Sequence, residues 1–400
     1  MLRSNTSRIW GPQTALALTL VCATGAAADP APITNGVSQI AVTLTGENGG
    51  ACVLDHDSAK AGPVTFTVTN TSAPAISELE LQSDNRILGE KENLAPGLPA
   101  SKFTVTLDGG SYQIYCPNAA QDTVAFTVTG TAKRASGSTA DLLKEGTQGY
   151  AKYVDGTVDA MLVATKRLQA AIDAGDLETA QADYAKARPF YERIESDVEG
   201  FVLPGFAPTD NAGNLDYLID MRASNLDPDI GWHGFHAIER DLFQRQSIGS
   251  DTQKRAAELT ANVTKLDALA KGLHYAPEDL ANGAAGLLEE VQSGKITGEE
   301  EAFSHIDLVD FAANIEGAQQ AFAFLEPGMM QIDPDLTRTI NARFATVEGM
   351  LKDYRDPKAL GGYVTYTPER RKADARKLSQ AIQSLQEPLA QIAEKVATAG

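Results

Sequence analysis

The sequence predicts a protein of two domains, an all-β sandwich followed by an all-α helical bundle. A chain of 400 residues exceeds what one hydrophobic core usually supports. Apolar residues alternate with polar ones from Ser38 to about Gly130, which is typical of half-buried strands. After this segment the apolar residues recur at helical spacing. The change of period marks the boundary between the two domains.

Residues 1–28 have the pattern of a secretory signal. Arg3 and Arg8 precede the apolar run TALALTLVCA, and a run of three alanines that ends at Ala28 offers a small-residue cleavage site. No later apolar run reaches the roughly 18 residues that are needed to cross a bilayer. We therefore expect cleavage after Ala28 and export to a bacterial periplasm, without insertion into the membrane.

The mature chain is expected to be strongly acidic. Without Arg3 and Arg8 the 34 basic residues become 32, against 53 acidic residues, so the formal charge falls from −19 to −21. Such a surface repels nucleic acid and anionic lipid, and it attracts cations. Nucleic acid is therefore not an expected partner.

Residues 29–131 are expected to form the β-sandwich. Short alternating runs, such as the one through Val64, Phe66 and Val68, are separated by turn-rich pieces such as GENGG and LDGGS. Short strands at this spacing favour a small sandwich. Cys52 and Cys116 both lie in this region. In an oxidising compartment two cysteines most often form one disulfide.

Residues 132–141 are small and polar, as expected of a linker, and residues 142–400 predict a bundle of seven or eight helices. In the first helix apolar residues keep helical spacing as far as Ile172, and Gly175 ends it. The start signals of later helices are Thr297 with Glu300 as a capping box, Asp333-Pro334 and Thr367-Pro368.

The stretch GWHGFHAIERDLF, residues 231–243, concentrates two of the five histidines of the chain. Asp229 can cap a helix over about 230–244, in which His236 and Glu239 share one face. Such a pair could bind a metal ion or a proton. It is equally compatible with a surface pair or a capping pair, which are common on helices.

Further acidic residues lie upstream of this stretch. A helix containing YERIESDVEG carries Glu192 and Glu195, which suit a metal site or a solvated acidic face with Arg193. Asp220 lies among apolar neighbours in YLIDMR. Burying that carboxylate without a partner would cost free energy, so it calls for Arg222 or for a cation.

Four motifs together resemble the EfeO branch of the imelysin family, whose members are periplasmic components of iron-uptake systems. These motifs are YERIE, the ID-x-R element, GFHAIE, and the long block GAAGLLEEVQSGKITGEEEAFSHIDLVDFAANIEGAQ. The resemblance extends over nearly the whole mature chain. It implies a cupredoxin-like domain followed by an imelysin helical domain.

The resemblance also implies a metal site in the helical domain. A set of carboxylates with one imidazole suits iron, and also zinc or manganese, but it is too poor in sulfur for cuprous copper. His233 and His305 are additional candidates, with a solvent-facing position expected for His233 and a ligand or a supporting role open for His305. The implied ligands are Glu192, Glu195, Asp220, His236 and Glu239.

The β-domain offers a second set of candidates at positions that match the family. Ordinary blue-copper chemistry needs two histidines, a cysteine and often a methionine, whereas this domain has only His56 and no methionine. A disulfide is therefore the expected state of the cysteines, and an unusual copper or iron site is the alternative. The candidate ligands of that site are Cys52, Cys116, Glu78 and Glu80, and Glu90 and Glu92 match further acidic positions of the family.

The function that the resemblance implies is capture of iron and its delivery to an inner-membrane permease, with a periplasmic haem peroxidase as a further partner. The alternatives are a metallopeptidase, since imelysin relatives have been grouped with these enzymes, and a polysaccharide-binding protein. The chain lacks the H-E-x-x-H motif of many zinc peptidases. An uptake component is therefore the expected function, and an enzyme is the weaker interpretation.

Overall fold

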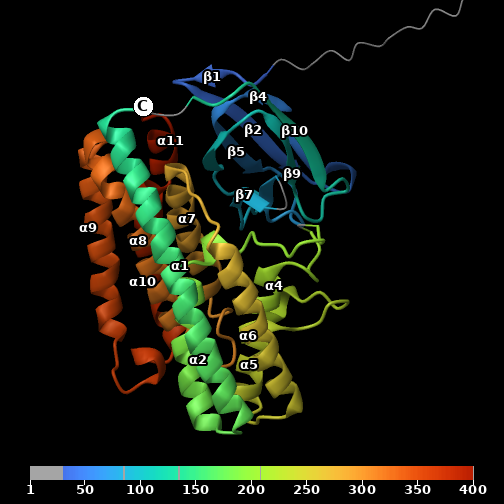
Figure 1. Ribbon diagram of the computed structural model, residues 1–400, viewed down its shortest axis with the longest axis vertical. Helices are drawn as coiled ribbons and strands as arrows, with labels where there is room; N and C mark the ends of the chain where they lie inside the picture. Colours follow the sequence, from blue (N-terminus) through green and yellow to red (C-terminus); the bar gives the residue numbers. More distant parts are fainter. Residues whose placement is uncertain (1–29, 84–85, 134–135, 208, 400) are drawn as a thin grey trace, which may run out of the picture.

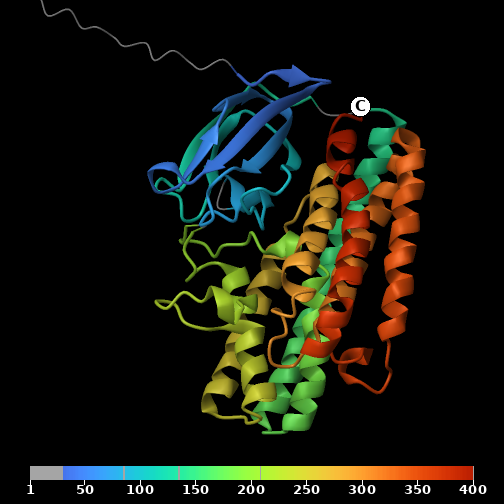
Figure 2. The same ribbon diagram turned by 180° about the vertical axis from the view of Figure 1, so that it is seen from behind.

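The computed structural model describes residues 30–83, 86–133, 136–207 and 209–399 (Figure 1). A β-domain packs beside one end of an elongated bundle of helices, as Figures 1 and 2 show from opposite sides. The predicted signal, residues 1–28, lies outside the described residues. No helix within the described ranges is long and apolar enough to cross a membrane.

The β-domain consists of two sheets of five strands each. One sheet has the order β1-β2-β5-β8 with β3 paired to β2, and the other has the order β4-β10-β9-β6-β7. The all-β sandwich is thus confirmed, and its likeness to cupredoxins stays a prediction. The strands are β1 Ile33–Thr34, β2 Val37–Thr45, β3 Ala51–Leu54, β4 Ser58–Lys60, β5 Gly62–Asn70, β6 Leu79–Ser83, β7 Arg86–Lys91, β8 Ser101–Leu107, β9 Gly110–Tyr115 and β10 Thr123–Thr129.

The core of the sandwich forms from the inward residues of the predicted alternating runs. Phe66 on β5 is paired in register with Phe103 on β8, and their ring centroids lie 5.1 Å apart. Phe126 on β10 of the other sheet packs edge-on against Phe66 at 5.3 Å. All three rings are buried, so they join the two sheets through apolar contact.

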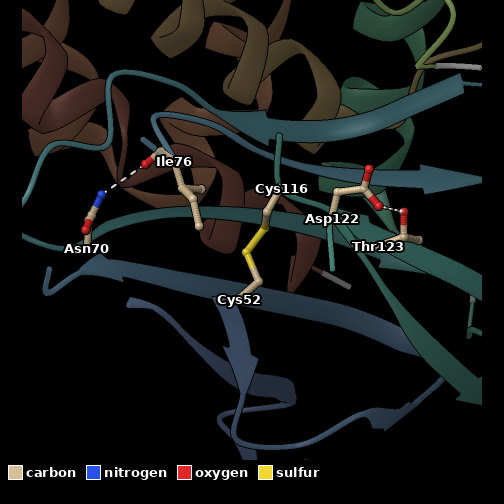
Figure 3. The surroundings of a disulfide bond; sticks show 6 residues. All are labelled: Cys52, Asn70, Ile76, Cys116, Asp122 and Thr123. Atoms are coloured by element: carbon tan, nitrogen blue, oxygen red, sulfur yellow. Dashed lines mark hydrogen bonds between the residues drawn. A yellow bond between two sulfur atoms is a disulfide. The ribbon is translucent and has the colours of Figure 1, made fainter. Parts of the chain in front are cut away.

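A disulfide links Cys52 on β3 to Cys116, which follows β9 (Figure 3). Both cysteines are buried, and the backbone N–H of Cys116 donates to the carbonyl oxygen of Asp122 at 2.7 Å. The expected pairing is confirmed. A sulfur in a disulfide is not a thiolate, so the alternative metal site that uses these cysteines as ligands does not apply to this state of the protein.

Removing this disulfide is expected to destabilise the β-domain. The bond joins two residues that are 64 positions apart in the sequence. Constraint of the unfolded chain by a loop of that length corresponds to about 4 kcal/mol in the chain-entropy model. Denaturant unfolding of Cys52→Ser/Cys116→Ser should therefore show a free energy of unfolding lower by roughly 2–4 kcal/mol. An unchanged midpoint would show that the two sheets hold together without the bond.

The helical domain begins with α1, whose 36 residues run the length of the bundle (Figure 1). It packs against α2, α6 and α8. Seven described helices have 14 residues or more, in agreement with the predicted bundle. The helices are α1 Ser138–Asp173, α2 Leu177–Glu192, α3 Glu195–Val198, α4 Leu215–Asp220, α5 Gly234–Glu239, α6 Ser250–Ala270, α7 Pro277–Glu290, α8 Asp307–Ile332, α9 Pro334–Leu351, α10 Pro368–Leu389 and α11 Ile392–Ala397.

Two of the three predicted start signals are confirmed. The side chain of Asp333 accepts from the N–H of Leu336 at the start of α9, and Thr367 caps α10 in the same way. The prediction of a helix start at Thr297 is wrong. Its hydroxyl donates to the carbonyl oxygens of the preceding turn, because Thr297 lies just after the π-helical segment Val291–Lys295.

The helix of the GWHGFHAIE stretch begins later than predicted. α5 starts at Gly234, and the π-helical segment Arg240–Gln244 follows it. Gly234 has a φ of 77°, and a Cβ there would collide with the carbonyl oxygen of Ile219. Only glycine suits that backbone geometry and approach, so the helix cannot extend back to residue 230. Asp229 therefore caps no helix.

The two domains contact each other along α7. Lys91 on β7 forms an ion pair of 2.6 Å with Glu289, and the side chain of Asn282 donates to the carbonyl oxygen of Thr104 at 2.7 Å. The backbone N–H of Thr106 on β8 donates to a carboxylate oxygen of Glu278 at 2.9 Å. These polar contacts fix the face of the β-domain that lies against the helical bundle.

Candidate metal centre

The five ligands implied for the helical domain all reach one buried region. They come from separate elements: the end of α2, the start of α3, the end of α4, and α5. None is more than 7% exposed. The solvated acidic face considered for α2 and the surface pair considered for α5 are therefore wrong. The buried residues are Glu192, Glu195, Asp220, His236 and Glu239.

His236 contributes both ring nitrogens to this region. Its Nε2 lies 3.2 Å from Oε1 of Glu300 and 3.6 Å from Oδ1 of Asp220. Donor atoms of these three residues all lie within 4.8 Å of one another. Its Nδ1 lies 3.3 Å from Oε2 of Glu239. Carboxylates on both sides of the ring fix its orientation, which is the usual arrangement of a histidine that binds a metal.

Two further groups of three adjoin this one. His236 and Glu239 form one with Glu301, and Asp220 forms the other with Glu192 and Glu195. Because His236 and Asp220 each belong to two groups, the three form one continuous cluster. Nearly every potential ligand in the cluster is a carboxylate oxygen. Hard cations prefer such ligands.

Arg188 lies at the centre of the cluster and is completely buried. Its Nη1 lies 2.8 Å from Asp220, and its Nη2 lies 2.8 Å from Glu300 and 3.3 Å from Nε2 of His236. It also forms an ion pair with Glu192, one turn further along α2. A guanidinium group is thus surrounded by the same atoms that are candidates to bind a metal.

Lys295 is the second buried cation of the cluster. Its Nζ lies 3.1 Å from Glu192, 3.3 Å from Glu195 and 3.5 Å from Glu300. The less buried Arg222 lies 3.1 Å from Glu300. These ion pairs compensate for much of the cost of burying so many carboxylates.

Carboxylates nevertheless outnumber cations in the cluster. Asp310 on α8 is completely buried, and neither of its side-chain oxygens accepts a hydrogen bond from the described residues. Its nearest cation is Nε of Arg188, at 4.0 Å. A buried carboxylate without hydrogen bonds is costly. The donor set therefore fits a site that gains stability when a further cation binds.

The pKa values of the cluster reflect burial and this balance of charge. Burial raises the pKa of Asp220 to about 7, even though Arg188 and His236 act in the opposite direction. Burial lowers the pKa of His236, but its hydrogen bonds with Glu239 and Glu300 outweigh that effect and hold the pKa well above its usual value. These carboxylates therefore favour the protonated form of the imidazole in the metal-free protein.

Several residues of the cluster were not predicted from the sequence. Glu300 was expected in a capping box, but its carboxylate lies between His236 and Lys295. Glu301 accepts a hydrogen bond from the hydroxyl of Tyr184 at 2.8 Å. The run of three glutamates at 299–301, within the long motif that resembles the family, was the available signal. No comparable pattern in the sequence indicates that Arg188 is buried.

Two candidate histidines lie outside the groups of possible ligands found among the described residues. His233 forms an ion pair of 3.0 Å with Glu258 on α6. Its ring is partly exposed, which agrees with the solvent-facing position that we expected. His305 has a left-handed backbone with a φ of 56°, and its carbonyl oxygen accepts from the N–H of Tyr366. A backbone role in the turn before α8 is what the structure shows for His305.

The glutamates of the β-domain form a separate acidic cluster at the domain interface. Glu78, Glu80 and Glu90 bring carboxylate oxygens within 4.8 Å of one another. Glu90 and Glu92 line a cavity of about 260 Å³ between β7 and the helical domain. Burial raises the pKa of Glu80, Glu90 and Glu92 to about 7, so a part of this cluster is protonated at neutral pH.

Fold and centre together define a class of protein: a β-sandwich joined to a helical bundle that buries a cluster of carboxylates around one histidine. The family model described as imelysin matches residues 146–392. The chain therefore belongs to the imelysin family, and the resemblance seen in its motifs is confirmed.

Three relatives match the chain over most of their own length. The chain is 39% identical over 254 residues to an Efem/EfeO family lipoprotein of Staphylococcus haemolyticus, in a match that covers 63% of this chain and 83% of that protein. It is 33% identical over 365 residues to the iron uptake system component EfeO of Escherichia coli, and the EfeO of Shigella flexneri gives the same figures. These matches cover 89% of this chain and 91% of each relative.

Proposed function

We propose that this protein is an iron-binding component of an uptake system, and that it holds its cargo at the buried centre of the helical domain. The observation that carries the proposal is the group formed by Asp220, His236 and Glu300, whose donor atoms lie within 4.8 Å of one another. Two carboxylates and an imidazole are suitable ligands for iron. The names of the relatives support iron as the cargo rather than zinc or copper.

Arg188 and Lys295 give the centre a way to bind and release a cation. In the metal-free protein their charges neutralise the carboxylates, with Nη2 of Arg188 only 3.3 Å from the candidate ligand atom of His236. An arriving cation must displace this guanidinium group, and a departing one lets it return. The competition lowers the net affinity, as a protein that passes on its cargo requires.

Glu192, Glu195 and Glu239 complete the proposed ligand set. Glu239 is held by the backbone N–H groups of Phe303 and Ser304, at 2.8 Å and 2.7 Å, through the oxygen that does not face His236. Its other oxygen can therefore orient the imidazole or bind the metal. Glu192 and Glu195 reach the centre from the side of Lys295.

The wider setting is proposed from the relatives. One is named a lipoprotein and the others are named components of an iron uptake system. We place this protein outside the cytoplasm after cleavage of residues 1–28, in a bacterial periplasm. Its proposed partners are an inner-membrane permease that receives the iron and a periplasmic haem peroxidase. A metallopeptidase remains the rival function, and chelator-sensitive cleavage of casein by the pure protein would support it.

A metal titration tests the proposal directly. Residues 29–400 would be titrated without oxygen with ferrous iron, zinc and cupric ions, and in parallel with ferric citrate. We expect one tight iron site per chain and weaker binding of the other metals. Failure of both forms of iron to bind would exclude iron as the cargo. Preference for cupric ions that persists in His236→Ala would move the metal site to the β-domain.

Iron binding is expected to weaken as the pH falls. The protonated form of His236 and the neutral form of Asp220, whose pKa is about 7, cannot bind the metal until they lose their protons. Each proton released on binding costs roughly tenfold in affinity per pH unit on the acid side. Ferrous iron titrations between about pH 7 and pH 5 should therefore show a dissociation constant that rises at least tenfold per unit. A flat profile would contradict protonated ligands in the metal-free centre.

A further inference from the structure

A hollow of about 580 Å³ lies between α2, α8 and the segment 355–363, which follows α9. Sites for small molecules usually have volumes of roughly 300–1,000 Å³. Ala185 and Pro189 of α2 line this hollow, whereas Arg188 of the same helix lies in the buried metal centre. The hollow is therefore a separate feature on another face of the helix. We call it the α2–α8 groove.

The groove exists because small residues form its floor and a fixed loop forms its wall. Within segment 355–363, Gly361 has a φ of 66°, and a Cβ there would collide with Val309 on α8. Glycine therefore lets the loop lie against the helix. The N–H of Asp356 donates to the carbonyl oxygen of Gly362 at 3.0 Å and closes the loop. The small residues of the floor are Ala182, Ala185, Ala312 and Ala313.

Positive charge surrounds the groove in a chain whose formal charge is −19. Glu316 is the acidic residue that lines it, and that carboxylate is already paired with Arg193 at 2.8 Å. The cations that line the groove are Lys186, Arg193, Arg355 and Lys358. Lys186 is likewise paired, with Asp183 at 2.9 Å, so Arg355 and Lys358 supply the unpaired positive charge that attracts anions.

Arg355 and Lys358 are the cations best placed to bind a ligand. The guanidinium group of Arg355 lies 4.1 Å from the centroid of the Tyr363 ring. Neither side chain has an ion-pair partner within the described ranges of the chain. Stacking on the ring fixes the plane of the guanidinium group, and the N–H groups that do not bond to the Tyr363 side chain can donate to a carboxylate. Lys358 adds a point charge on the same rim.

We propose that the α2–α8 groove binds a small organic polycarboxylate. The cations would hold the carboxylates, and the alanine and proline floor would contact the carbon skeleton. An apolar floor favours an organic anion over an inorganic one, because inorganic phosphate would gain nothing from those contacts. This inference goes beyond the proposed iron function and does not depend on it, since the groove shares no lining residue with the metal centre.

The test uses tricarballylate, a tricarboxylate without a hydroxyl group, and inorganic phosphate as probes for calorimetric titration of metal-free residues 29–400 at fixed ionic strength. We expect saturable binding of tricarballylate at one site and at least tenfold weaker binding of phosphate. Arg355→Ala and Lys358→Ala should each weaken tricarballylate binding at least tenfold. The matched control Lys352→Ala removes an exposed lysine next to the groove that does not line it, and should change little.

A further variant tests whether binding requires the hollow itself or only the positive charge around it. Ala182→Trp fills the hollow and leaves all four cations in place, so it should abolish binding. Thermal unfolding of each variant would verify that it folds. Binding that persists in Ala182→Trp, or phosphate binding as tight as that of tricarballylate, would overturn the proposal. The iron affinity of Arg355→Ala should equal that of the wild type, which would show that the groove and the metal centre act independently.

Discussion

Replacing His236 with alanine is expected to weaken iron binding by at least about 100-fold. Residues that only support a metal ligand already contribute about 10–100-fold to affinity, and His236 is proposed as a ligand itself. Its Nε2 is the nitrogen donor in the group with Asp220 and Glu300. Glu300→Gln should cause a loss of similar size, because an amide oxygen keeps the shape of the side chain but carries no charge.

His233→Ala is the matched control for this experiment. It removes the same ring three residues earlier, where the histidine is paired with Glu258 outside the centre. Trp232 provides the readout, since it is the single tryptophan of residues 29–400 and packs over Arg240 beside the start of α5. Iron affinity that is unchanged in His236→Ala, or equally reduced in His233→Ala, would remove His236 from the ligand set.

Replacing Arg188 with methionine is expected to destabilise the metal-free protein by roughly 3–5 kcal/mol, the usual cost of removing one partner from a buried ion pair. The guanidinium group is completely buried, and its loss leaves Asp220, Glu192 and Glu300 with less compensation. Urea unfolding measures the change. Added iron should restore much of the lost stability, because a bound cation takes over the role of the arginine and stabilises the folded state by mass action.

Arg193→Met, five residues further along the chain, is the control for this variant. Arg193 forms a partly exposed pair with Glu316, for which a contribution of about 0.2–1 kcal/mol is typical. If Arg188→Met lost no more stability than Arg193→Met, the buried carboxylates would have to be neutral without the arginine. If iron failed to restore Arg188→Met while it still stabilised the wild type, Arg188 would support the ligands rather than occupy their site.

The sequence determined the fold class because both domains depend on local patterns. Alternation through Phe66 predicted the β-sandwich, and the caps at Asp333 and Thr367 predicted the starts of α9 and α10. Those signals act within a few residues of the chain, where spacing alone fixes which face is apolar or which N–H needs an acceptor. The predicted start of α5 was wrong because Gly234 packs against the carbonyl oxygen of Ile219. That contact joins two separate elements, so local spacing does not reveal it.

The sequence also supplied five of the acidic and imidazole side chains in the centre, since YERIE, the ID-x-R element and HAIE are short motifs with local spacing. Only the tertiary structure placed Glu300 beside His236, 64 residues away, and surrounded Arg188 with carboxylates. The same is true of the α2–α8 groove, which joins residues from three distant segments. Burial and long-range pairing of charges depend on how the helices pack, and no local spacing encodes that packing.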